Sequence, residues 1–290
     1  MGGLLEWSHD GRDWPNRDSS RFMSAGGLNW HVQDMGSGPV LLLLHGTGAS
    51  THSFRHLAPL LARHARVIVP DLPGHAFSGS APDPTLEGMG AALIALMRML
   101  DVRPEMIVGH SAGAAIGAQM LRASGDGARL LVGLGSALLP FPGATGALFP
   151  TFARMMFANP FAPEMVAAST RYGGGMGGFL QSSTGSRIDV QGLKLYDRLF
   201  RHSGHVSGAM RMMAHWEQEA LSRHLPLLGT PMLLIHGDRD AAVPVDVPLE
   251  VKALVPDTVV EIVPGLGHLI HEEDPRMIAE RVLRAMAVAV

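Results

Sequence analysis

The chain has 290 residues, of which 47% are hydrophobic and 17% are charged. This composition can build a core and excludes wholesale disorder. With 23 basic and 26 acidic residues, no long run of Lys or Arg and no cysteine, we expect neither a nucleic-acid partner nor disulfides, cysteine-ligated metals or thiol catalysis.

The start of the chain and its apolar runs bear on its location. Residues 1–18 carry four acidic side chains and lack the apolar segment of a signal peptide. The longest apolar run, Val40–Leu44, is too short to cross a bilayer. We therefore expect a cytoplasmic protein without a transmembrane segment.

Short apolar runs alternate with stretches of helical periodicity along most of the chain. Residues 20–34, broken by Gly26-Gly27, are expected to form a leading antiparallel hairpin. The later runs are apolar along most of their length, as strands covered on both faces should be. This alternation predicts an α/β fold, with a mostly parallel sheet and helices on both faces. The predicted strands are Val40–Leu44, Ala65–Val69, Met106–Val108, Leu130–Leu134, Pro231–His236 and Val259–Val263.

Apolar residues three and four positions apart predict helices between these strands. One such stretch covers residues 54–61 and another residues 86–100. Near the end, Asp274 can cap a helix that Pro275 opens. The inner face of this last helix should carry Ile278, Val282 and Met286.

One interval breaks the rhythm, because about 95 residues separate the strand that ends near Gly135 from the one that starts at Pro231. A crossover between parallel strands needs far fewer. The interval is rich in Phe and Met, and we interpret it as an inserted helical cap over residues 137–216. The core domain would then comprise residues 1–136 and 217–290.

The segment Gly109-His110-Ser111-Ala112-Gly113 has the form G-x-S-x-G. It follows a predicted strand and precedes a stretch of small residues that should be helical, which is the setting of a nucleophile elbow. The elbow would project the hydroxyl of Ser111 above the sheet. The alternative is a glycine-rich turn that only packs a helix against a strand.

The segment His45-Gly46-Thr47-Gly48 follows the strand Val40–Leu44. We expect the N–H groups of Thr47 and Ala112 to form an oxyanion hole. A glycine-rich loop could instead hold a phosphate, but the spacing of the known nucleotide-binding motifs is absent.

Two further segments at predicted strand ends supply an acid and a base. Asp238 and Asp240 follow one strand and His268 follows the next, at the edge where open α/β sheets place their sites. The chain order Ser111, Asp240, His268 is that of one class of serine hydrolase. Asp238 is suited to cap the turn through its own backbone.

Together these motifs resemble the α/β-hydrolase family over nearly the whole chain. The segment Asp71-Leu72-Pro73-Gly74-His75 is similar to the family's loop after the fourth strand, although Ala76 stands where the family usually has Gly. The resemblance implies the α/β-hydrolase fold with the cap inserted after the sixth strand. In that family the triad acid lies three residues after a glycine, so the resemblance implies that Asp240, three residues after Gly237, is the triad acid rather than Asp238.

A narrower resemblance is to the magnesium-chelatase accessory hydrolases found with bacteriochlorophyll biosynthesis genes. It implies a setting in tetrapyrrole metabolism and magnesium chelatase subunits as partners. The similar segments are Asp13-Trp14-Pro15-Asn16-Arg17, Arg21-Phe22, Trp30-His31-Val32-Gln33, the run from Gly36 to Ser53, residues 109–115, Ala137-Leu138-Leu139-Pro140-Phe141 and residues 212–216.

The implied chemistry is acyl transfer from an ester to water. His268 would take the proton of Ser111 as it attacks, and Asp240 would hold the imidazole in the correct tautomer. Neither a metal nor another cofactor is expected, since the scattered histidines lack metal-ligand spacing.

The cap residues leave the substrate open. Aromatic and Met side chains suit a bulky apolar ester or a planar tetrapyrrole-like ligand, although they could equally form the cap's own core. Three functions therefore remain: an ester hydrolase of pigment synthesis, a non-catalytic porphyrin-handling partner of the chelatase, and a general carboxylesterase or C–C bond hydrolase. As substrate-binding residues we predict His110, Phe141, Phe149 and Met212.

Overall fold

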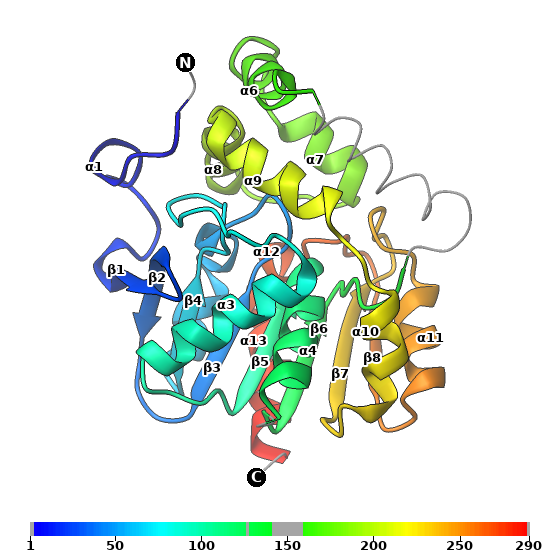
Figure 1. The fold of residues 1–290 in the computed structure, drawn as a ribbon. Helices are drawn as coiled ribbons and strands as arrows, with labels where there is room; N and C mark the ends of the chain where they lie inside the picture. Colours follow the sequence, from blue (N-terminus) through cyan, green and yellow to red (C-terminus); the bar gives the residue numbers. More distant parts are fainter. Residues whose placement is uncertain (1–2, 126–127, 141–158, 289–290) are drawn as a thin grey trace.

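The computed structural model describes residues 3–125, 128–140 and 159–288 (Figure 1). Phe141 and Phe149 lie outside the described residues. At the centre is an eight-stranded sheet in the order β1-β2-β4-β3-β5-β6-β7-β8, parallel from β4 to β8. The strands are β1 (Ser20–Ala25), β2 (Leu28–Met35), β3 (Val40–Leu44), β4 (Arg66–Pro70), β5 (Met106–His110), β6 (Leu130–Leu134), β7 (Met232–Gly237) and β8 (Val259–Val263).

The predicted leading hairpin is confirmed. Strands β1 and β2 pair in antiparallel register, and β2 continues antiparallel to β4. The turn between β1 and β2 consists of Gly26 and Gly27, with φ of 59° and 76°. Two consecutive positive φ angles are the geometry of a tight hairpin turn that glycine adopts without strain.

Helices cover both faces of the sheet, as predicted (Figure 1). Because side chains alternate along a strand, Leu42 and Leu44 of β3 face one core cluster, and Leu41 and Leu43 face the other. All four are fully buried. The first cluster includes side chains of α3 (Leu86–Met99), α4 (Ala112–Ser124), α10 (Glu219–His224) and α11 (Asp246–Leu254), and the second those of α2 (Leu57–Leu61), α12 (Ile270–Glu273) and α13 (Pro275–Val288).

The helix ends follow the expected capping chemistry. The Oδ1 of Asp274 accepts a hydrogen bond from the N–H of Met277 at 3.0 Å, and α13 begins at Pro275 as predicted. The helix predicted over residues 54–61 is instead divided into η2 (Thr51–Phe54) and α2. Pro59 lacks an N–H and so cannot donate to a carbonyl one turn earlier, which works against one continuous helix.

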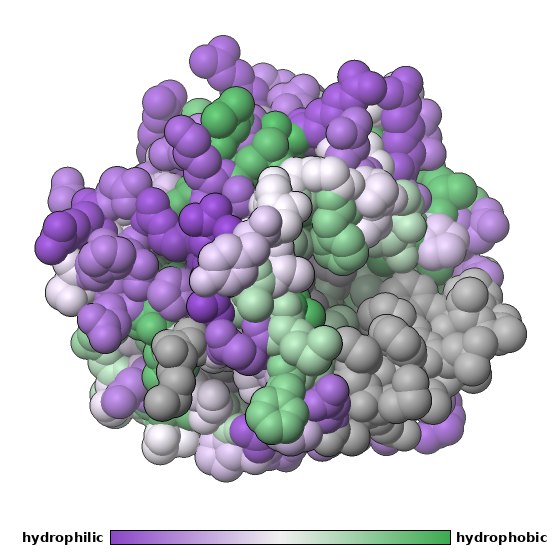
Figure 2. Space-filling view, turned by 90° about the horizontal axis from the view of Figure 1, so that it is seen from above, coloured by the Kyte–Doolittle hydropathy of each residue, from purple (hydrophilic) through white to green (hydrophobic). Residues whose placement is uncertain are grey.

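In the described part of the segment between β6 and β7, helices α6 to α9 lie beyond the carboxyl ends of the parallel strands (Figure 1). Their outer surface mixes hydrophilic and hydrophobic side chains (Figure 2). We retain residues 137–216 as the proposed extent of the cap. These helices are α6 (Ala162–Tyr172), α7 (Gly177–Thr184), α8 (Val190–Phe200) and α9 (Ser203–Ala214).

Side chains at the start and in the middle of α8 contact a buried ion pair of the core. The guanidinium of Arg55 pairs with the carboxylate of Glu272, and both side chains are at most 1% exposed. Arg55 also pairs with Asp189, the N-cap of α8, at 3.0 Å. The hydroxyl of Tyr196 on α8 donates to the same Glu272 at 2.8 Å. Separating α8 from the core would therefore remove Asp189 and Tyr196 from the buried Arg55–Glu272 pair, which would keep only each other as partners.

Histidine 205 forms a second connection between cap and core. Its Nδ1 accepts from the N–H of Ala76 at 3.0 Å, and its Nε2–H donates to the carbonyl of Gly48 at 3.0 Å. Ala76 adopts a φ of 43°, so it keeps the left-handed conformation for which the family uses glycine.

The remaining short elements lie near the start of the chain and before β7. No helix in the part of the chain that the structure describes is long and apolar enough to cross a membrane. The short elements at the start of the chain are α1 (Trp7–Asp10) and η1 (Arg17–Ser19), and the one before β7 is η3 (Leu225–Leu227).

Candidate active site

Serine 111 occupies a sharp turn between β5 and α4. Its φ of 51° and ψ of −119° form an unusual backbone conformation for a residue with a side chain. The flanking glycines permit this turn, because a Cβ at Gly109 would collide with the backbone of Ala114 and one at Gly113 with the carbonyl of Leu44. These are the local features of the predicted elbow.

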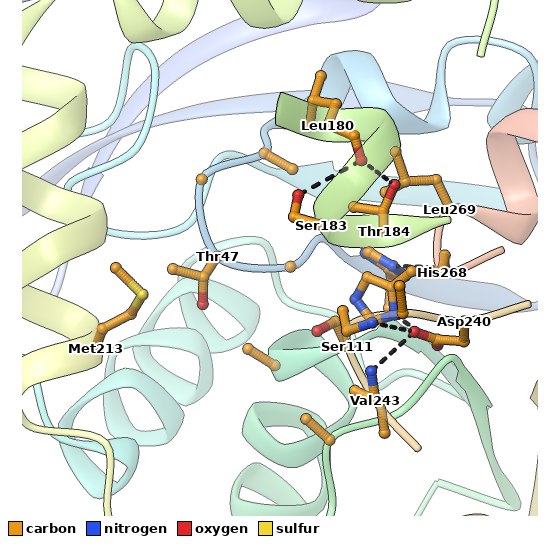
Figure 3. Close-up of a pocket in the computed structure, with 18 of the residues that line it drawn as sticks. Thr47, Ser111, Leu180, Ser183, Thr184, Met213, Asp240, Val243, His268 and Leu269 are labelled. Atoms are coloured by element: carbon orange, nitrogen blue, oxygen red, sulfur yellow. Dashed lines mark hydrogen bonds and ion pairs between the residues drawn. The ribbon is translucent and has the colours of Figure 1, made fainter. Parts of the chain in front are cut away.

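His268 and Asp240 lie next to Ser111 (Figure 3). The Nδ1 of His268 is 2.7 Å from Oδ2 of Asp240. A carboxylate only accepts hydrogen bonds, so the neutral imidazole carries its proton on Nδ1 and leaves Nε2 free to accept one. The backbone N–H of His268 donates to the carbonyl of Thr184 at 2.8 Å, which fixes the loop that carries the ring.

The two candidate acids differ in their surroundings. The side chain of Asp240 is fully buried, and its Oδ1 accepts from the N–H groups of Ala242 and Val243, both at 2.8 Å. Asp238 is exposed and accepts from the N–H of Gly265 at 2.7 Å. Only Asp240 is in contact with His268, whereas Asp238 joins two loops.

Two further residues next to this pair had no role in the sequence analysis. Gly135 follows β6 with a φ of 50°, and a Cβ there would lie 3.0 Å from Nδ1 of His268 and 3.2 Å from Oδ2 of Asp240. The Nε2–H of His236 donates to the carbonyl of Val243 at 3.0 Å and lies 3.3 Å from Oδ2 of Asp240. Their positions at the ends of β6 and β7 were the available signal.

The two residues predicted for the oxyanion hole line the same cavity as Ser111. Ala112 is the first residue of α4, where a backbone N–H has no acceptor within its helix. Thr47 follows β3, and the adjacent Gly46 is so close to the elbow that a Cβ there would lie 3.1 Å from that of Ser111. Both N–H groups therefore come from segments packed around the nucleophile.

His110 lines the cavity but is only 3% exposed. Its Nε2–H donates to the carbonyl of His268 at 3.1 Å, and its ring centroid lies 4.7 Å from that of His268 and 4.5 Å from that of His271. Burial holds the pKa of His110 well below 6.5, and the neighbouring histidines lower it further. A neutral His110 thus supports the backbone of the candidate base.

A cavity of about 840 Å³ opens above Ser111. Met213 lines it, whereas the predicted substrate-binding residue Met212 is fully buried in the core and contacts Thr47 through its sulfur, 3.7 Å from the hydroxyl. Met212 and Met213 are consecutive residues of α9, so their side chains point in different directions around the helix. Aromatic and aliphatic residues that the sequence analysis did not single out line it as well: Phe179, Leu180, Tyr196, Phe200, Trp216 and Leu269.

A hydrogen-bonded chain of Ser, His and Asp lies elsewhere in the fold. The hydroxyl of Ser20 on β1 is 3.0 Å from Nε2 of His31, whose Nδ1 is 2.7 Å from Oδ2 of Asp71. Burial raises the pKa of Asp71, but the contact with His31, together with His45 and the N–H of Thr51, outweighs burial and brings the pKa to about 2. This chain fastens the leading hairpin to the loop after β4.

Within the described ranges, no three histidine or carboxylate side chains are grouped so that they could hold a metal ion.

Comparison with known proteins identifies the family. The model of the alpha/beta hydrolase fold family matches residues 39–275. The chain belongs to the α/β-hydrolase family. Among solved structures, this α/β-hydrolase is similar to an epoxide hydrolase, CorEH, with a TM-score of 0.78 at 21% identity over 93% of this chain and 99% of that one. It is also similar to a thermophilic esterase from Thermogutta terrifontis, with a TM-score of 0.72 at 20% identity over 93% and 98%.

Among curated proteins, this α/β-hydrolase is 42% identical to the magnesium-chelatase 30 kDa subunit of Rhodobacter capsulatus. That match covers 266 residues, 90% of this chain and 92% of the relative. It is 27% identical to the uncharacterized hydrolase YugF of Bacillus subtilis over 87% of this chain and 91% of that one. The resemblance stated from the sequence motifs is thereby confirmed.

Proposed function

We propose that this α/β-hydrolase is a serine hydrolase that transfers the acyl group of an ester to water. The observation that carries the proposal is the buried Asp240 in contact with His268, next to a serine on a strained elbow in the same cavity. This arrangement supports a Ser-His-Asp mechanism, with Ser111 as nucleophile, His268 as base and Asp240 as acid.

The reaction would proceed in two acyl-transfer steps. The Oγ of Ser111 attacks the ester carbonyl while Nε2 of His268 takes its proton. The N–H groups of Thr47 and Ala112 stabilise the oxyanion, and such a donor is typically worth about 3–4 kcal/mol. His268 then protonates the leaving alcohol, and a water activated by the same ring releases the acid and restores Ser111.

Labelling with a fluorophosphonate tests the nucleophile. The wild-type protein should be labelled on Ser111 and should hydrolyse p-nitrophenyl esters, whereas Ser111→Ala should do neither and should retain its circular dichroism spectrum. Ester turnover by Ser111→Ala at the wild-type rate would refute the assignment.

The substrate proposed from the cavity is bulky and apolar. A volume of about 840 Å³ is at the upper end of small-molecule sites, and the aromatic and Met side chains in its wall suit such a ligand. We therefore expect faster turnover of long-chain than of acetyl esters, and His110 contributes to the floor of the site.

The setting proposed for this activity is bacteriochlorophyll and magnesium-porphyrin synthesis, with magnesium chelatase subunits as partners in the cytoplasm. The 42% identity with a magnesium-chelatase subunit supports it. Deleting the gene should alter the pigments that accumulate. Unchanged pigments would favour a general carboxylesterase or a C–C bond hydrolase.

A second candidate function is a non-catalytic one, in which the protein handles porphyrin for the chelatase. It is favoured by the relative's name, which describes a subunit rather than a hydrolase. Complementing the deletion strain with Ser111→Ala separates the two. Restored pigment synthesis would support the non-catalytic role, and failed restoration by a stably expressed variant would support catalysis.

A further inference from the structure

The hydroxyl groups in the cavity wall are already committed within the protein. Besides Ser111, four side-chain hydroxyls line the cavity in the described part of the chain. On α7, that of Ser183 donates to the carbonyl of Phe179 at 2.7 Å, and that of Thr184 to the carbonyl of Leu180 at 2.5 Å (Figure 3). Each hydroxyl lies one helical turn after the carbonyl that accepts from it.

The other two hydroxyls also donate to partners in the protein. That of Tyr196 donates to Glu272 at 2.8 Å, and burial beside this carboxylate raises the pKa of Tyr196 well above 10. The hydroxyl of Thr47 points to the sulfur of Met212 at 3.7 Å. A hydroxyl has only one proton to donate, so none of the four has a second one for a bound ligand.

The charged groups of the wall are also unsuited to an anion. Among the lining residues that the structure describes, none is Lys or Arg, the carboxylate is that of Asp240, and His268 is paired with that carboxylate through Nδ1. His110 is held neutral by burial and already donates its Nε2–H to a carbonyl. The indole N–H of Trp216 is a neutral donor. A carboxylate needs cations or several donors to offset its lost hydration, and these side chains do not supply them.

We infer that this cavity selects a substrate whose buried part carries no charge. It discriminates against an otherwise matched substrate whose buried chain has the same length but ends in a carboxylate. The inference rests on the proposed hydrolase function and adds the substrate class. An acid-bearing substrate would have to enter with its carboxyl groups esterified or directed out of the cavity mouth. For a tetrapyrrole, this means that side-chain carboxylates are masked or remain in water.

Matched pairs of esters test the inference on both sides of the scissile bond. The acyl-side pair is p-nitrophenyl decanoate and the mono-p-nitrophenyl ester of decanedioic acid. The alcohol-side pair is n-octyl acetate and 7-carboxyheptyl acetate, followed by acid release. In each pair the carboxylate should lower kcat/KM by about 100-fold or more, because the wall offers it neither a cation nor enough hydrogen-bond donors. The methyl ester of the decanedioate probe should restore the rate.

Equal kcat/KM within threefold in either pair would overturn the inference while leaving the proposed function intact. Failure to hydrolyse every ester would overturn the proposed function, and the inference with it.

Two neighbouring serines on α7 supply a charge-placement test. Ser183 lines the cavity, whereas Ser182 is exposed and does not contribute to its wall. In Ser183→Lys, the ammonium should raise kcat/KM for the carboxylated ester relative to its neutral partner by about tenfold in at least one pair. Ser182→Lys should leave both ratios at their wild-type values. A common response of the two variants, or none in Ser183→Lys, would contradict the inference.

Discussion

Acidification should destabilise this protein through its buried histidines, and His205 allows the effect of one of them to be measured. Burial lowers the pKa of His205 to about 4, and its two ring nitrogens already accept from Ala76 and donate to Gly48. A proton added at Nδ1 would remove the acceptor that Ala76 uses. The folded state therefore stabilises the neutral form of the ring.

The direction and size follow from proton linkage. In the unfolded chain an imidazole titrates near 6.5, so below that pH the unfolded state takes up a proton that the folded state does not. The folded state loses stability as the pH falls from about 6.5 to about 4, and the full effect is about 3 kcal/mol. Between pH 7 and pH 5, this one group should account for about 2 kcal/mol.

Urea unfolding of wild type and His205→Gln at pH 7 and pH 5 measures this. The Gln amide can accept from Ala76 and donate to Gly48 but does not titrate. Between pH 7 and pH 5, the free energy of unfolding of His205→Gln should therefore fall by about 2 kcal/mol less than that of the wild type, although other buried histidines will lower both values. The exposed His64 supplies the control, and His64→Gln should keep the wild-type difference. An equal fall in His205→Gln and wild type would refute the reasoning.

Three further predictions concern the site and its attachment to the cap. Asp240→Asn should lower kcat by about 10⁴-fold, because the amide favours the wrong tautomer of the ring, and Asp238→Asn should cost much less; equal, mild losses measured by steady-state kinetics would contradict the choice of acid. Gly135→Ala should reduce kcat sharply, since its Cβ would press on the His–Asp pair at a backbone φ of 50°; full activity in the alanine variant would show that the pair tolerates displacement. Arg55→Met should lower the free energy of unfolding by about 3–5 kcal/mol because it leaves Glu272 buried without its cation. The double variant, Arg55→Met with Glu272→Gln, should recover part of that loss. A double variant no more stable than the single one would argue against the unpaired charge as the cause.

The sheet and the core of the candidate site could be predicted because local sequence encodes them. Apolar runs mark buried strands, and the glycines around Ser111 mark a turn that other residues cannot make. The position of Asp240 relative to its glycine likewise identified it as the residue that contacts His268.

The cavity wall depends on contacts that sequence patterns do not record. Both Met212 and Met213 are apolar residues on one helix, and only the rotation of α9 on the core decides which one lines the cavity. The packing of α7 and α8 over the site is tertiary, so Leu180 and Tyr196 gave no local signal. Gly135 acquires its role only because three strand ends meet behind the imidazole.

The Ser20–His31–Asp71 chain gives this fold a natural comparison for what activates a serine. Both Ser20 and Ser111 lie next to a His–Asp pair in the described part of the chain. Ser20, however, has ordinary extended backbone, with φ of −77° and ψ of 134°, and its N–H is bonded to the carbonyl of Arg17. It follows a short turn rather than opening a helix. The ratio of labelling rates at Ser111 and Ser20 would therefore measure how much reactivity the elbow and its backbone donors add to a serine that lies next to a His–Asp pair.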